Sequence, residues 1–139
     1  MGNFIHGLVL ICMLTQPALG DVIYNRDVEE EFNQITLLQI FTKKQRFWSD
    51  GSKIVVFIKP INSIEHKYFV SIWLGVPLSR YKSMLESEVY AGTSTGVNEV
   101  KSDSEMYIQV STTPNSIGYY DGKIYKNTGG GNVKVYSRM

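Results

Sequence analysis

The feature that most constrains the fold is the uninterrupted apolar run Ile54–Ile58. Successive side chains of a strand point to opposite faces, so a run without a polar residue has to be covered on both faces. Such strands lie in the middle of sheets that carry helices on both sides. The preceding Ser49–Ser52 segment predicts a tight turn, because Asp50 can bond its own backbone and Gly51 accepts positive φ. The run therefore predicts a buried central strand in an α/β fold.

The first twenty residues are predicted to be a secretory signal peptide. Phe4–Leu14 is a mostly apolar run, and Ala18-Leu19-Gly20 places small residues at the positions that a signal peptidase reads. The apolar run is shorter than the roughly 20 residues that span a bilayer, which disfavours a membrane anchor. We therefore predict cleavage after Gly20, one domain spanning residues 21–139, and a periplasmic or secreted location.

The mature chain is expected to be held together by its core alone. Cys12 is the only cysteine and lies within the signal, so neither a disulfide nor a thiolate metal site is expected. A formal net charge of +1 predicts no broad nucleic-acid-binding surface. Basic residues are nevertheless frequent between Lys43 and Lys67. Such a cluster is usually a solvated face, and a mild preference for anions is the sharper alternative.

The rest of the chain predicts alternating strands and helices. Strands are expected at Val22–Tyr24 and Ile117–Tyr120, with a closing hairpin formed by Ile124–Tyr125 and Val133–Tyr136. Helices are expected over Ile35–Phe41, from Ser63 to Leu74, after Pro77, and from Ser102 to near Thr112. The apolar face of the second helix is expected to consist of Ile64, Tyr68, Phe69, Ile72 and Trp73. This order predicts an α/β fold with a mixed sheet flanked by helices.

The segment Met106–Val110 is ambiguous, because it also alternates like a strand. The preceding Ser102-Asp103-Ser104-Glu105 sequence is a capping box, in which the hydroxyl and the carboxylate each satisfy a free backbone N–H. We therefore favour the helix.

Catalytic and metal-binding patterns are not evident. Once the signal is removed, His66 is the only histidine, which excludes a multi-histidine metal site and leaves no Ser/His/Asp set. Glu29–Glu31 are consecutive and therefore point in different directions. Gly129–Gly131 lacks the lysine and the strand–loop–helix setting of a phosphate loop, so it predicts a hairpin tip. We expect no enzyme activity, no cofactor and no metal.

Three hydroxyl-rich places are candidates for binding an anion, since helix N-termini present free N–H groups to anions. The first is Asn62 and Ser63, with His66 and Lys67 one turn further on; the second is the loop Thr93, Ser94 and Thr95; the third is Ser102 with Ser104. Ordinary helix capping or a solvent-facing loop is the alternative for each. The third is disfavoured, because Asp103 and Glu105 would repel an anion.

Two ring side chains, Trp48 and His66, each have two alternative roles. Trp48 either stacks on a ligand or, as we prefer, covers the edge of the sheet or the end of a helix. His66 either titrates near pH 6.5 and tunes anion affinity, or is a partly exposed helical side chain without a function.

The pattern Ile40-Phe41-x-x-Lys44-x-x-x-Trp48-x-Asp50-Gly51 resembles a segment of the substrate-binding proteins of phosphate-type ABC transporters. Further along, Val110-x-x-x-Pro114-x-x-Ile117-Gly118-Tyr119 is similar to a second segment of that family. The order and spacing of such pieces extend the resemblance over residues 21–120. It implies a single lobe of the type II periplasmic-binding-protein class, which has two lobes in full-length members.

The resemblance also implies a function. It suggests a periplasmic protein that binds phosphate or a similar oxyanion, works with an ABC-type transporter, and obtains the missing lobe from a homodimer. The alternative is a module, derived from one lobe, that docks on an envelope protein without a small ligand. Phe47 and Trp48 are then the candidates for an exposed apolar patch.

Overall fold

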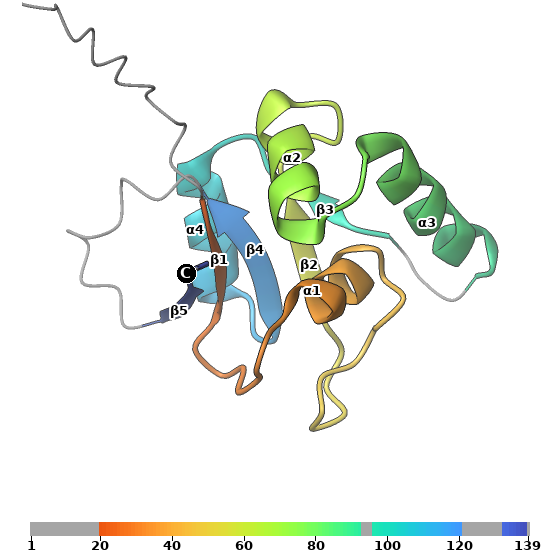
Figure 1. The fold of residues 1–139 in the computed structure, drawn as a ribbon. Helices are drawn as coiled ribbons and strands as arrows, with labels where there is room; N and C mark the ends of the chain where they lie inside the picture. The colour runs from red at the N-terminus through yellow and green to blue at the C-terminus, as the bar shows by residue number, and fades with distance from the viewer. Residues whose placement is uncertain (1–19, 93–95, 121–131, 139) are drawn as a thin grey trace, which may run out of the picture.

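A five-stranded mixed sheet forms the centre of the computed structural model, which describes residues 20–92, 96–120 and 132–138. The strands are β1 (Asp21–Asn25), β2 (Val55–Ile58), β3 (Asn98–Glu99), β4 (Ser116–Tyr120) and β5 (Val133–Tyr136), and their order across the sheet is β3-β2-β4-β1-β5. β2 runs parallel to both β3 and β4, whereas β1 is antiparallel to β4 and β5 (Figure 1). The predicted α/β class with a mixed sheet is confirmed.

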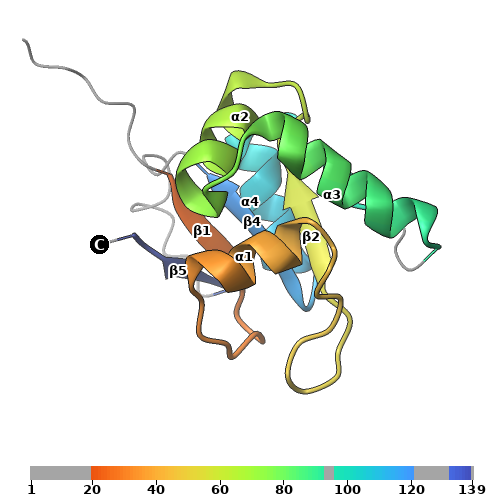
Figure 2. The same cartoon turned by 45° about the vertical axis from the view of Figure 1, so that its right-hand side comes forward.

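Helices cover both faces of this sheet. They are α1 (Gln34–Phe41), α2 (Ile64–Phe69) with its π-helical continuation η1 (Val70–Leu74), α3 (Leu78–Tyr90) and α4 (Asp103–Thr112). α1 and α2 lie on one face and α4 on the other, as the views in Figures 1 and 2 show. None of the helices in the described ranges combines the length and apolarity needed to span a bilayer. The predicted signal peptide, apart from Gly20, lies outside the described residues.

β2 occupies the central position that its apolar sequence predicts. It lies between β3 and β4, with Phe57 opposite Asn98 and Val56 opposite Ile117. Its last three residues are buried, and so is Ile54 immediately before the strand. The run is covered on both faces because α1 and α2 pack on one side and α4 on the other.

α4 forms as the capping box predicts and ends at Thr112. Ser102 Oγ accepts the Glu105 N–H at 3.1 Å, and Glu105 Oε2 accepts the N–H of Lys101, one residue before the cap. The helix approaches β4 closely at Gly118, where an added Cβ would lie 2.5 Å from Met106 Sδ. A larger residue at this position would force the Met106 side chain to shift.

The edges of the sheet differ from the sequence prediction. β3 was not predicted, because two exposed polar residues carry no periodic signal. β5 was predicted to pair with Ile124–Tyr125, which lie outside the described residues; within the described residues β5 pairs with β1. Strand pairing between distant segments depends on register across the whole sheet, which local sequence does not specify.

The amino end of β2 is closed by hydrogen-bonded turns. Asp50 Oδ1 accepts the Ser52 N–H at 2.8 Å, and Gly51 has a φ of 86°, as the turn sequence predicts. Trp48 is buried, and its Nε1–H donates to the Asn115 carbonyl at 3.0 Å. Its preferred role of covering the sheet is confirmed, and the idea of an exposed Trp48 in a docking patch was wrong.

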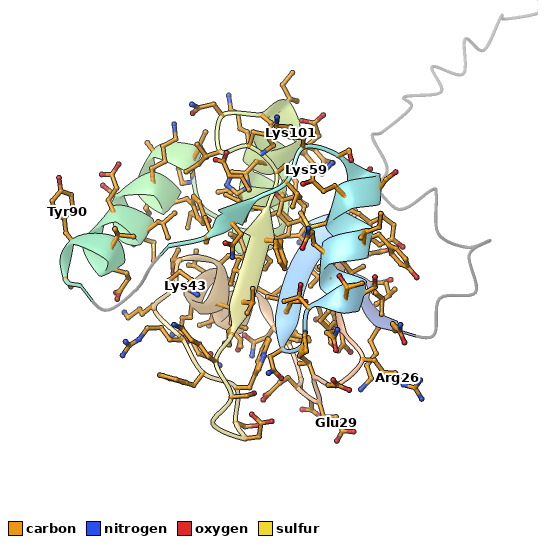
Figure 3. The ribbon with its side chains drawn as sticks, turned by 180° about the vertical axis from the view of Figure 1, so that it is seen from behind. Arg26, Glu29, Lys43, Lys59, Tyr90 and Lys101 are labelled. Atoms are coloured by element: carbon orange, nitrogen blue, oxygen red, sulfur yellow. The ribbon has the colours of Figure 1, made fainter. Side chains whose placement is uncertain are left out.

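The basic residues between Lys43 and Lys67 do not form one solvated face. The Lys43 side chain is buried and donates to the Ile54 carbonyl at 3.2 Å, and Lys59 is buried as well. Figure 3 shows these two lysines at well-separated positions on the molecule. Burial lowers the pKa of Lys43, and the charges of Lys53 and Arg46 lower it further.

Candidate functional site

The clearest concave site lies at the carboxyl end of β2 and β4. Ligand sites of open α/β sheets lie at this edge, where strands end and helices begin. A pocket of about 260 Å³ opens there, close to the first residues of α2 and α4. Its lining residues are Gly20, Lys59, Ile64, Glu65, Tyr68, Phe69, Trp73, Asp103, Tyr119 and Tyr120.

Two charged side chains form an ion pair at this pocket. Lys59 follows directly after β2, and its Nζ lies 2.5 Å from Oδ1 of Asp103, the first residue of α4. The Lys59 side chain is 8% exposed and that of Asp103 is 21% exposed. A buried ammonium group needs such a partner because its desolvation is costly. The Asp103 carboxylate also lies at the N-terminus of α4, where the positive end of the helix dipole stabilises its negative charge.

The backbone around Lys59 is held by the end of β4. Its N–H donates to Tyr119 Oη at 2.9 Å, and the same oxygen lies 2.6 Å from His66 Nδ1. The Tyr119 hydroxyl and the His66 ring therefore share one short hydrogen bond, whose direction follows the tautomer of the ring. His66 Nε2 has no hydrogen-bond partner among the described residues.

His66 is fully buried rather than partly exposed, so the prediction of a solvent-accessible histidine was wrong. Burial lowers its pKa to about 4, and the nearby charge of Lys82 lowers it further. Its ring lies edge-on to Tyr81, whose hydroxyl donates to the Phe41 carbonyl at 2.9 Å. The imidazole is therefore a neutral part of the core at physiological pH.

Stacked aromatic rings form the wall of the pocket. The Phe69 and Tyr119 rings are parallel within 6°, with centroids 3.7 Å apart. The Trp73 ring also stacks on Phe69, with centroids 6.4 Å apart. The π-helical turn η1 carries Trp73 one turn after Phe69. Such π-turns occur often at functional sites. These rings are buried and mutually packed, so the wall is rigid.

The first predicted anion site lies beside this pocket but does not line it. Ser63 caps α2 by accepting the His66 N–H at 3.2 Å. Asn62 is exposed, and its Oδ1 accepts a hydrogen bond from Lys82 Nζ at 2.5 Å. Lys67 is exposed, and His66 points into the core. The four residues are therefore not brought together around one cavity.

Helical periodicity explains this separation. Residues 64, 65, 68 and 69 share the face of α2 that lines the pocket, whereas residues 63, 66 and 67 lie on its other sides. Ile64 was predicted to face the core with Phe69, but it is 84% exposed, at the pocket. Thr93, Ser94 and Thr95, the second predicted place, lie outside the described residues.

At the third predicted place, Ser102 acts as the N-cap of helix α4. Ser102 Oγ is used by Glu105, and Asp103 is paired with Lys59. Among the described residues, no group of three histidine, cysteine or carboxylate side chains is arranged to hold a metal ion.

Sequence reasoning missed Lys59 and Asp103, and also the role of Tyr119 and Tyr120. Lys59 carries one usable signal: a lysine between a buried parallel strand and Pro60 lies where ligand sites form. Asp103 was interpreted as part of a capping box and as a charge that would repel an anion. Their pairing requires β2 and α4 to be adjacent at one edge, which depends on the order of strands in the sheet.

The fold is that of a single periplasmic-binding-protein-like lobe, with a mixed sheet flanked by helices. Among solved structures, the chain is similar to PstS from Borrelia burgdorferi, with 19% sequence identity and a TM-score of 0.50. The match covers 73% of this chain and 40% of that protein, so the chain spans less than half the length of this neighbour. No family profile and no curated protein sequence matches the chain.

Proposed function

We propose that this protein is an exported, non-catalytic, small-ligand-binding protein whose ligand occupies the pocket at the carboxyl end of β2 and β4. The observation that carries the proposal is the pocket itself, of about 260 Å³, at the edge of the sheet where α/β folds bind ligands. It combines an apolar lining with a few polar groups, which is the usual composition of a small-molecule site. The likeness to PstS supports the fold and adds weak support to a binding function.

A phosphate-like oxyanion is the ligand that the sequence resemblance suggests. The predicted residues Asn62, Ser63, His66 and Lys67 lie beside this pocket at the start of α2, where Ser63 Oγ accepts the His66 N–H and Asn62 Oδ1 accepts from Lys82 Nζ. Together with Thr93–Thr95 they form the predicted anion-binding set. An ABC-type transporter is the corresponding partner, and a homodimer is the arrangement that would supply a second lobe.

Isothermal titration calorimetry tests the binding proposal directly. The protein is titrated with phosphate, with sulfate and with a panel of small organic compounds, while circular dichroism confirms that it is folded. Saturable heat with any of these ligands supports the proposal. A folded protein that binds none of them contradicts it.

An interaction module without a small ligand is the second candidate, and one observation favours it. Phe47 is 50% exposed, with the Arg46 guanidinium 5.6 Å above its ring. Partly exposed aromatic residues beside arginine are frequent in protein interfaces. Capture of an envelope protein that is lost in Phe47→Ser and retained in Ile108→Ser, on helix α4, would support this candidate.

A further inference from the structure

We infer that the pocket binds a small organic molecule with an apolar, preferably aromatic, body and a polar head group, in preference to an inorganic oxyanion. The inference rests on the proposed function and names the class of its ligand. It follows from the walls of the pocket, from its charges and from its size.

The walls favour an apolar body. Six of the lining residues are apolar or aromatic, namely Ile64, Tyr68, Phe69, Trp73, Tyr119 and Tyr120. An inorganic oxyanion keeps its charge only if hydrogen-bond donors replace its water shell, and moving it against apolar walls without them is costly. An aromatic ring, by contrast, gains from contact with other rings in offset or edge-to-face arrangements.

The charges also disfavour an oxyanion. One lysine and two carboxylates line the pocket, since Lys59 is accompanied by Asp103 and by Glu65. The Lys59 ammonium is already neutralised by Asp103 at 2.5 Å, which leaves the carboxylate of Glu65 in excess. A neutral or cationic head group can hydrogen-bond to this ion pair, whereas phosphate would be repelled by the unpaired carboxylate of Glu65.

Polar side chains at the pocket are pre-organised for a head group. Tyr119 Oη is fixed by Lys59 N–H and by His66 Nδ1. Trp73, 4% exposed, has an Nε1–H without a hydrogen-bond partner among the described residues. A buried donor without an acceptor is unfavourable, so a ligand acceptor that pairs with this N–H would be favoured.

The size selects a small molecule over a macromolecular segment. A cavity of about 150 Å³ suffices for a benzene ring, so about 260 Å³ accommodates one substituted ring. A partner helix is about 10–12 Å in diameter with its side chains and does not fit such a volume. A side chain from a second copy of the chain is the competing occupant of the pocket, and sedimentation velocity distinguishes it from a small ligand.

The two tryptophans of the chain provide an internal control. Trp73 lines the pocket, whereas Trp48 is bonded to Asn115 at the opposite end of β2. In a ¹⁵N-labelled protein, isolated in its exported form after expression of the full chain with its signal, each indole N–H gives one signal. The variants Trp48→Phe and Trp73→Phe assign the two signals.

The test is a titration with benzyl alcohol, benzylamine, benzoate and inorganic phosphate. We expect benzyl alcohol or benzylamine to shift the Trp73 indole signal saturably, with the Trp48 signal unchanged. Ile64→Ser removes an apolar contact at the pocket from a residue that is 84% exposed, and it should weaken binding about fivefold. Ile35→Ser, which changes an isoleucine that is 71% exposed on α1, should leave the affinity unchanged.

The outcomes separate this inference from the proposed function. Binding of phosphate alone overturns the inference and leaves the proposed function intact. Binding of no compound by the folded protein overturns both. Sedimentation velocity covers the competing occupant: a dimer that Ile64→Ser converts to a monomer shows that a second copy fills the pocket, and this also overturns the inference.

Discussion

The two ends of β2 each hold a buried lysine and a buried tryptophan, but they use them differently. At the amino end, Lys43 donates to a backbone carbonyl, and Trp48 bonds to the Asn115 backbone. At the carboxyl end, Lys59 pairs with the Asp103 carboxylate, and Trp73 lines a pocket. The amino end is thus closed by bonds within the chain, whereas the carboxyl end keeps polar groups beside a cavity.

This difference shows why similar residues have different consequences at the two ends. A lysine that contacts only a carbonyl loses part of its preference for the charged state, which is why the pKa of Lys43 is lowered. A lysine that is buried against a carboxylate makes the fold depend on that partner. Four predictions, in order of expected size, test this contrast.

The largest effect is expected from breaking the ion pair. Asp103→Ala leaves the Lys59 ammonium buried and unpaired, and should lower the free energy of unfolding by about 3 kcal/mol in urea denaturation. Lys43→Met, at the other end, should lower it by only about 1 kcal/mol, since it removes one hydrogen bond to the Ile54 carbonyl together with the desolvation cost of the ammonium group. Equal losses of unfolding free energy in the two variants would contradict the proposed difference between the two ends of β2.

A matched control separates the charge from the packing. The double variant Lys59→Met with Asp103→Leu replaces the pair by apolar groups of similar size and should regain most of the lost stability.

The second effect is a pH dependence that belongs to the carboxyl end. The folded-state pKa of His66 is about 4, below its ordinary value of 6.5, so between these values the folded state binds fewer protons than the unfolded state. Stability should be highest above pH 6.5 and should fall by roughly 3 kcal/mol as the pH drops to 4. Urea denaturation at a series of pH values measures this loss.

The variant His66→Gln isolates the histidine from the carboxylates that titrate in the same acidic range. It should show a smaller loss of stability between pH 6.5 and 4 than the unmodified chain. Identical slopes would mean that His66 does not carry the acid sensitivity.

A smaller effect is expected for the tryptophan at the amino end. Trp48→Phe keeps a ring in the core but loses the hydrogen bond from Nε1 to the Asn115 carbonyl, leaving that acceptor unsatisfied. The expected loss of stability is about 1–2 kcal/mol, measured by thermal or urea unfolding. Ligand affinity at the pocket should stay unchanged, and a change would show that the two ends are coupled.

The smallest effect concerns the turn that enters β4. Asn115 has a φ of 62°, in the left-handed region, where alanine is disfavoured by roughly 1 kcal/mol. Asn115→Ala should therefore lose about this amount in urea denaturation, while Asn115→Gly should be close to neutral. A larger loss in Asn115→Gly than in Asn115→Ala would show that the side chain, not the backbone conformation, is what matters there.

Local sequence predicted much of the fold because many elements carry their own signals. The apolar run of β2, the cap of α4 at Ser102 and the end of the second helix at Leu74 each depend on residues close to one another in the chain. The edge strand β3 and the pairing of β5 with β1 depend on contacts between distant segments, and these were missed or incomplete.

The candidate site was predicted less well for the same reason. The sequence pointed to the start of α2, which does lie beside the pocket, but it selected residues of the wrong face. Ser63 and His66 stabilise the helix from within, whereas Ile64, Glu65 and Tyr68 line the pocket. A cap sequence shows where a helix starts, but not which of its sides is left uncovered by the rest of the chain.

The sequence by itself determined the class of the fold, the central position of β2 and the starts of several helices, because propensity, capping and hydrophobic periodicity act over a few residues. Tertiary structure alone decided that Lys59 meets Asp103, that Tyr119 holds His66 in the core, and that stacked rings border a pocket. These contacts join β2, β4, α2 and α4, and they exist only because the strand order brings the ends of those elements to one edge of the sheet.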